Sequence, residues 1–88
     1  MVFFMVLKKY KIKNEEGLHA RPASDFCKEA VKYKSKITLI KDGEEYEAKS
    51  ILMVLCAGAV KGDTIEIKAE GDDEAEAVDA LIKVLDLG

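Results

Sequence analysis

The apolar and polar positions of this 88-residue chain follow two different periods. Residues 6–12 alternate apolar and polar side chains, apart from Lys8, and residues 64–70 alternate without exception, which indicates half-buried strands. Two further β-prone runs, residues 36–41 and 44–48, flank Asp42 and Gly43. An Asp-Gly pair in that position predicts a tight hairpin, because both of its central positions require a positive φ.

Three other segments have the period or the end signals of helices. Residues 20–32 place apolar side chains on one face and polar ones on the other, which predicts an amphipathic helix. Ser50 precedes an apolar run that Gly58 interrupts, so a helix of about two turns is expected, with Ser50 as its N-cap. Asp72 or Asp73 is expected to cap a last helix, and Asp73 with Glu76 has the spacing of a capping box. The apolar stripe predicted for that helix comprises Ala75, Val78, Leu81, Ile82 and Leu85.

The resulting order, β-α-β-β-α-β-α, predicts an α+β fold of the two-layer, open-faced sandwich type. A four-stranded antiparallel sheet would carry three helices on one face and expose the other to solvent. The length fits a single domain over residues 1–88. The opening MVFFMVL is too short for a membrane span or a signal core, so we expect a cytoplasmic protein without membrane insertion. Residues 1–5 either extend the first strand or form an N-terminal extension, with Met5 as an alternative start.

Charge narrows the classes of partner. The net charge of -3 argues against a general nucleic-acid binder. Residues 1–41 nevertheless carry a net charge of +6 (ten basic, four acidic) and residues 42–88 one of -9 (four basic, thirteen acidic). This division favours either a basic face for an acidic protein partner or ordinary solvated surfaces. Cys27 and Cys56 are isolated from each other and from the single histidine, so we expect no metal site and no cofactor.

The only histidine, the only arginine and the only proline of the chain lie within four positions, as His19, Arg21 and Pro22. They fall at the start of the first predicted helix, where free amides and the helix dipole bind anions. The guanidinium of Arg21 suits phosphate oxygens, a proline is tolerated in a first turn, and Gly17 permits a tight turn before the histidine. The cluster therefore suggests that His19 accepts a phosphoryl group. The competing interpretation is that His19 is merely a surface residue or a helix cap.

Two motifs in this chain resemble those of a known family. GLHARPA, at residues 17–23, resembles the active-site signature of the HPr phosphocarriers of the bacterial sugar phosphotransferase system. KSIL, at residues 49–52, resembles the regulatory-serine motif of the same family. The predicted element order is also that of HPr proteins, and the resemblance covers the chain from about Leu7.

The resemblance implies a stoichiometric carrier rather than an enzyme. His19 would take a phosphoryl group on Nδ1 from phosphorylated enzyme I and pass it to enzyme II A domains. Arg21 would stabilise the phosphoryl oxygens, and the backbone amides of Ala20 and Arg21 would bind them.

A second site is implied at Ser50. In many relatives this serine is phosphorylated by HPr kinase/phosphorylase, and the phosphorylated form binds the catabolite control repressor. Ile51, Leu52 and Leu55 resemble the apolar docking patch of the family, although they could equally belong to the core. A short, nearly all-apolar helix cannot bury every face, so we expect at least Leu52 or Met53 to be exposed. Met53 and Cys56 stand where glycine and serine are usual, which alters the surface that the kinase and repressor would meet.

Three alternative functions are open on the sequence alone. The chain could be an HPr-like regulator that acts through Ser50, but some regulators of that kind lack the histidine, so His19 favours the carrier. It could serve a nitrogen-type or dihydroxyacetone phosphotransfer chain. A small α+β binding module without phosphate chemistry is the third class, and it gives no reason for the motif around His19.

Overall fold

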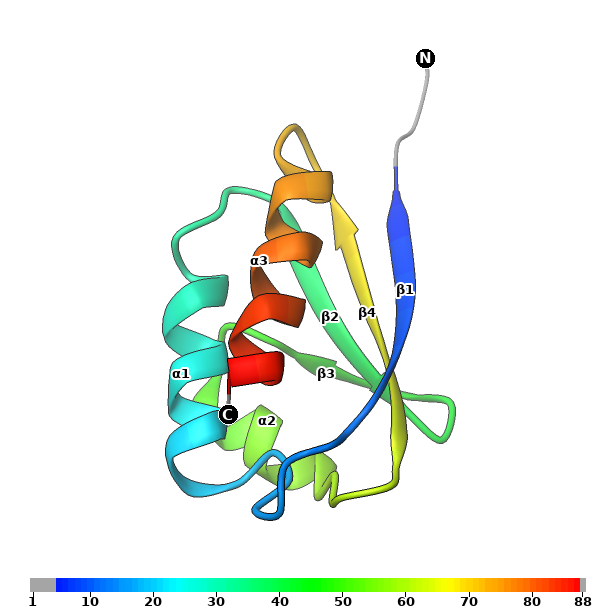
Figure 1. The fold of residues 1–88 in the computed structure, drawn as a ribbon. Coiled ribbons are helices and arrows are strands. Elements are labelled where there is room, and N and C mark those ends of the chain that lie inside the picture. Colours follow the sequence, from blue (N-terminus) through cyan, green and yellow to red (C-terminus); the bar gives the residue numbers. More distant parts are fainter. Residues whose placement is uncertain (1–4, 88) are drawn as a thin grey trace.

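The computed structural model describes residues 5–87, and its elements follow the predicted order. Residues 1–4 lie outside that range, so the N-terminal extension remains a prediction. Within the described range the elements, labelled in Figure 1, are β1 (Val6–Lys11), α1 (Ala20–Ala30), β2 (Lys36–Lys41), β3 (Glu44–Glu47), α2 (Ile51–Ala57), β4 (Thr64–Glu70) and α3 (Glu74–Leu87).

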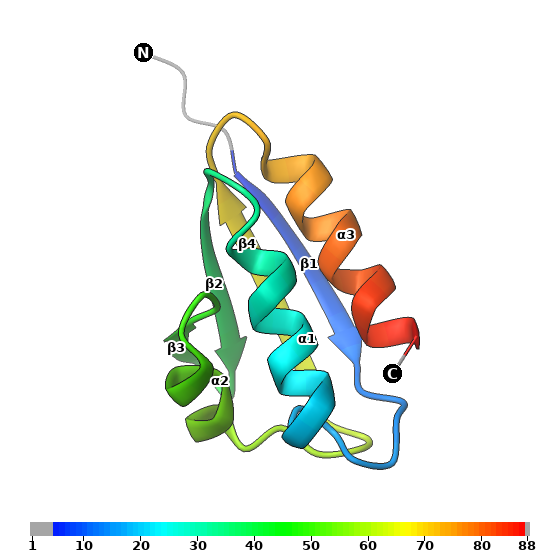
Figure 2. The same ribbon diagram turned by 90° about the vertical axis from the view of Figure 1, so that its left-hand side faces the viewer.

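The strands form one antiparallel sheet in the order β1-β4-β2-β3. Figure 2 shows α1 and α3 side by side across one face of this sheet, with α2 next to β3. This is the predicted two-layer α+β sandwich. Asp42 and Gly43 form the β2–β3 turn with φ values of 53° and 80°, as the hairpin signal required.

The core lies between the helices and the inner face of the sheet. The alternation in β4 is confirmed, because Ile65, Ile67 and Ala69 are fully buried. In the register of the sheet, Ile67 lies opposite Leu39 of β2, which is also fully buried. Burying large aliphatic side chains of this kind contributes about 1.5–3 kcal/mol each. The outer face is not solvent-exposed at every position as predicted, since Thr38, which alternates with the inward-facing Ile37 and Leu39, is only 5% exposed.

Two helix predictions need correction. α1 ends at Ala30 rather than at residue 32, because the following amides of Lys32 and Tyr33 bond to carbonyls three residues back and tighten the last turn. In α3, Ala75 is exposed and Ala77 takes its place in the core. The buried stripe of α3 comprises Ala77, Val78, Leu81 and Leu85, and Ile82 is half-buried.

The predicted capping box at the start of α3 is wrong. Among the described residues, the Asp73 carboxylate accepts hydrogen bonds from the backbone amides of Lys34 and Ser35, both at 2.9 Å, and from the Ser35 hydroxyl. It therefore joins the α1–β2 connection to α3 instead of bonding to Glu76. No helix within residues 5–87 is long and apolar enough to cross a membrane.

Candidate functional site

His19 lies between β1 and α1, at the N-cap position of α1. Its backbone is extended, with φ -143° and ψ 161°, and its side chain makes no capping hydrogen bond. The residue is exposed. The structure therefore leaves the imidazole available to a partner molecule, and it does not support the interpretation of His19 as a helix cap.

The start of α1 is a positive helix end without a compensating acid, because its first turn contains no Asp or Glu. Such an end attracts anions. Ala20 has a φ of 52°, in the left-handed region, which is uncommon for a residue with a Cβ atom and costs about 1–2 kcal/mol. Nothing in the sequence signals this conformation. It shows that the chain is held in a sharp turn where it passes from His19 into α1.

Gly17 and Leu18 attach the loop that carries His19 to the segment after α2. Leu18 is 1% exposed, and its amide donates a hydrogen bond of 2.9 Å to the Ala59 carbonyl. Gly17 has a φ of 65°, and a Cβ atom placed there would lie 2.5 Å from the Ala59 oxygen and 2.8 Å from Val60 Cα. Glycine is thus required both by the backbone conformation and by the close approach of a second loop.

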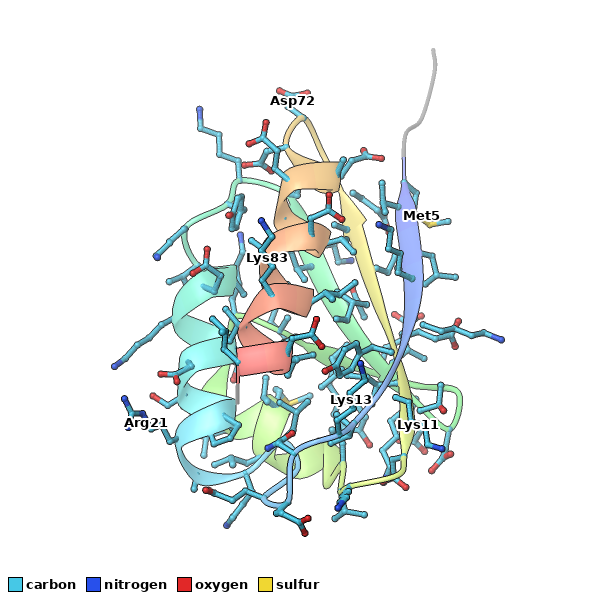
Figure 3. The ribbon with its side chains drawn as sticks, viewed as in Figure 1. Met5, Lys11, Lys13, Arg21, Asp72 and Lys83 are labelled. Carbon is cyan, nitrogen blue, oxygen red and sulfur yellow. The ribbon has the colours of Figure 1, made fainter. Side chains whose placement is uncertain are left out.

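Arg21 is close to His19 in sequence, but its side chain points elsewhere. The side chain is 91% exposed, and its Nε atom lies 3.8 Å from the Asp25 carboxylate one turn along α1. Figure 3 shows it projecting outward from α1. Among residues 5–87, no hydrogen bond or ion pair joins Arg21 to His19. An exposed and weakly paired arginine can change its rotamer without disturbing the core.

Ser50 is the N-cap of α2, as predicted. Its hydroxyl accepts a long hydrogen bond of 3.4 Å from the Met53 amide. The helix ends at Gly58, which adopts the expected left-handed conformation. Ser50 is only half-buried, so its hydroxyl is a structural cap that solvent and partners can still approach.

The predicted docking patch is divided between surface and core. Ile51 and Leu52 are 39% and 71% exposed, and Met53 is 38% exposed, which confirms the expectation that α2 cannot bury every face. Leu55 is half-buried and packs against the core. The apolar surface of α2 is therefore formed by Ile51, Leu52 and Met53, and for Leu55 the competing assignment to the core is largely correct.

Hydrogen bonds between distant segments support the Ser50 site, and the sequence alone does not indicate them. The Cys27 thiol donates to the Lys49 carbonyl at 3.0 Å, and the Lys49 ammonium donates to the Tyr33 carbonyl at 2.7 Å. The residue that precedes Ser50 is therefore held by α1 and by the connection that follows it. Both cysteines are free. Within the described part of the chain, no three potential metal-ligating His, Cys, Asp or Glu side chains come together.

The fold and sequence match proteins of one class, the phosphocarriers. Residues 6–86 match the family model described as the PTS HPr component phosphorylation site. The phosphocarrier protein HPr of Vibrio cholerae is 40% identical over 93% of this chain and 96% of its own, and the HPr-like protein Crh of Halalkalibacterium halodurans is 42% identical over 93% and 98%. A crystal structure of HPr from Thermoanaerobacter tengcongensis superimposes with a TM-score of 0.90, at 41% identity, over 92% of this chain and 91% of that one.

This chain belongs to the HPr family of phosphocarrier proteins. The predicted fold and the predicted class of function are therefore both confirmed. Membership also places the protein among the components of a phosphotransferase system, whose function is to pass phosphoryl groups between proteins.

Proposed function

We propose that this protein is a stoichiometric phosphoryl carrier, rather than an enzyme, and that Nδ1 of His19 is the acceptor atom. The observation that carries the proposal is the position of His19, exposed at the start of α1, with no acid in the first turn. In a family described by a phosphorylation site, this is the only histidine of the chain.

The chemistry needs only an unprotonated imidazole and compensation for phosphoryl charge. The Nδ1 lone pair attacks phosphorus, so that an N–P bond forms while the bond between phosphorus and the donor breaks and the donor keeps its electron pair. In the next step the N–P bond breaks and the acceptor forms the new bond to phosphorus. Backbone amides of Ala20 and Arg21 offset the charge on the phosphoryl oxygens. Arg21 joins them by exchanging the Asp25 carboxylate for the phosphoryl group.

We further propose that phosphorylated enzyme I is the donor and that enzyme II A domains are the acceptors, in the cytoplasm. Ile51, Leu52 and Met53 provide exposed apolar surface in α2. The segment that follows α2 contains Ala59, whose carbonyl binds the amide of Leu18, the residue before His19. Large apolar side chains exposed together are typical of a protein-binding surface.

The experiment follows the phosphoryl group through both steps. Purified protein is mixed with labelled phosphoenolpyruvate and enzyme I, and an enzyme II A domain is then added. We expect label on the wild type, its transfer to the enzyme II A domain, and no label on His19→Ala. Equal labelling of wild type and His19→Ala would overturn the proposal.

Ser50 is a candidate for regulation by phosphorylation. Its half-buried hydroxyl precedes α2, and added phosphate would lie at a helix N-terminus, where negative charge is favourable. The solution structure of Crh, described as the catabolite repression HPr of Bacillus subtilis, is 35% identical to this chain, and this similarity supports the second function in part. Incubation with ATP and the HPr kinase/phosphorylase should give an acid-stable phosphate on Ser50, and that form should bind the catabolite control repressor. Without such a phosphate, Ser50 would be a helix cap only.

A further inference from the structure

The backbone that supports the His19 loop is a short connection between α2 and β4. We call residues 58–63 the platform loop. Its Ala59 carbonyl accepts a hydrogen bond from the Leu18 amide, and its backbone at Ala59 and Val60 leaves no room for a side chain at Gly17. The position of His19 relative to the rest of the molecule therefore depends on where the platform loop lies.

Two charged side chains hold the platform loop in place. The Asp63 carboxylate accepts a hydrogen bond of 2.9 Å from the Val60 amide and so closes the loop on itself. The Lys41 ammonium, at the end of β2, lies 3.6 Å from that carboxylate and donates a hydrogen bond of 3.3 Å to the Gly58 carbonyl. Lys41 thus connects the first and last residues of the loop. It also lies 4.0 Å from the exposed Asp42 carboxylate.

This pair is better shielded from solvent than most ion pairs of the molecule. The side chains of Lys41 and Asp63 are 21% and 32% exposed, compared with 91% and 49% for Arg21 and Asp25. Ion pairs that are partly removed from water, with hydrogen bonds to the backbone, constrain geometry more than exposed pairs do. Neither Lys41 nor Asp63 belongs to the two family motifs, and within residues 5–87 no hydrogen bond or ion pair joins either of them to His19.

We propose that Lys41 and Asp63 are positioning residues for phosphoryl transfer at His19. They act through the platform loop, because the Ala59 carbonyl holds Leu18, the residue immediately before His19. The inference rests on the proposed function of His19 as the acceptor. Transfer between two proteins requires the acceptor nitrogen in line with the phosphoryl group, and a small displacement of a reacting group lowers the rate steeply.

The test compares Lys41→Met with a matched control, Lys68→Met. The Lys68 side chain is also 21% exposed and is paired with two acids, Glu45 and Glu70, but it lies on the outer face of the sheet. Both variants lose one partly shielded ammonium group and keep an unbranched, apolar side chain of similar length. Only Lys41→Met should displace the platform loop.

Two readouts are measured at a temperature where both variants are folded. The first is the set of backbone amide resonances of Leu18 and His19, which report the loop geometry without any phosphoryl chemistry. The second is the rate of transfer from phosphorylated enzyme I to this protein as its substrate, with the kcat and KM of that reaction determined separately. For Lys41→Met we expect shifted resonances and a kcat about tenfold lower. Lys68→Met should match the wild type in both, and Lys41→Arg should restore the rate.

The proposal is overturned if Lys41→Met keeps the wild-type resonances and the wild-type kcat, or if Lys68→Met lowers kcat equally. If Lys41→Met does not fold, Asp63→Asn replaces it, since an amide oxygen can still accept from the Val60 amide but, without a net charge, attracts the Lys41 ammonium much less. Asp63→Asn is expected to give the same shifted resonances and reduced kcat, and wild-type values would overturn the proposal. A wild-type protein that takes no phosphoryl group would instead refute the proposed function, and the resonances would still test the positioning.

Discussion

Gly17 and Arg21 each lie two residues from His19, and the structure constrains them in opposite ways. Gly17 is buried against the Ala59 carbonyl, whereas the Arg21 side chain is almost fully exposed. Gly17 therefore serves to place the loop that carries His19, and the Arg21 side chain is free to make the contact proposed for it with a phosphoryl group. Each assignment predicts a different balance between loss of stability and loss of transfer.

Arg21→Ala should reduce transfer with little effect on stability. The pair with Asp25 is exposed and 3.8 Å long, so its loss should cost less than about 0.5 kcal/mol in the free energy of unfolding. Loss of a charged hydrogen-bond donor to the phosphoryl group should slow transfer by about tenfold or more. Denaturant unfolding and transfer kinetics measure the two effects, with Lys28→Ala, elsewhere on α1, as the control. A larger loss of stability with unchanged transfer would make Arg21 structural.

Gly17→Ala should destabilise the protein because the added methyl group overlaps the platform loop. Forcing extra volume into a packed site costs about 1–3 kcal/mol. Gly43→Ala is the control, since Gly43 also has a positive φ, 80°, but a Cβ there would meet nothing within 4 Å. The difference in unfolding free energy between the two variants isolates the clash. Equal destabilisation would show that only the backbone conformation matters at Gly17.

At the scale of the elements, Asp73 connects α3 to the turn between α1 and β2. The hydrogen bond from the Ser35 hydroxyl is the main reason why the pKa of Asp73 lies below its usual value, and the Lys34 amide acts in the same direction. Gly71 permits this contact, since a Cβ there would lie 2.6 Å from Ser35 Oγ. A carboxylate thus attaches the start of α3 to the connection that follows α1.

Asp73→Asn should destabilise the protein most at near-neutral pH. Because the folded-state pKa is lowered, the carboxylate contributes stability that is fully present above the ordinary value of 3.8 and is lost as the pH falls through the folded-state pKa. The difference from wild type in urea unfolding should therefore shrink in acid. Asp72→Asn, at the exposed neighbouring residue (Figure 3), should show no such difference. A difference for Asp73→Asn that is independent of pH would contradict this role.

The elements also show what local sequence can and cannot predict. The strand alternation, the Asp42-Gly43 turn and the Ser50 cap depend on neighbouring residues, and all three were predicted correctly. The Asp73 interaction could not be predicted, because its partners lie 38 and 39 positions away in sequence. Capping-box spacing identified the right carboxylate but the wrong hydrogen-bond donors, since donors from the α1–β2 connection replaced the local amide.

At the scale of the whole molecule, the charge division along the sequence does not become a division in space. β4, from the acidic half, lies between β1 and β2 of the basic half, and α3 lies beside α1. Ion pairs connect the two halves, as between Lys8 and Asp79 at 2.9 Å and between Lys41 and Asp63. Part of the basic charge is therefore neutralised within the fold, which favours ordinary solvated surfaces over a single basic face.

The site was predictable to the extent that it is local. Helix starts and short motifs depend on consecutive residues, so the sequence alone indicated the candidate residues His19, Ala20, Arg21 and Ser50. The platform loop could not be predicted in this way, since it depends on the segment before β4 meeting the first loop, and nothing in the sequence signals the left-handed φ of Ala20. The residues proposed to perform transfer are thus close to one another in the sequence, whereas the residues that position them come from distant parts of the sequence.

The most direct test of the proposed function determines which atom of the protein carries the phosphoryl group. Nitrogen-15-labelled protein is phosphorylated with phosphoenolpyruvate and enzyme I, and the imidazole nitrogens are observed by NMR together with the phosphorus signal. We predict one acid-labile phosphoryl group, coupled to Nδ1 of His19. A phosphoryl group on Nε2, on another residue, or on no residue at all would contradict it.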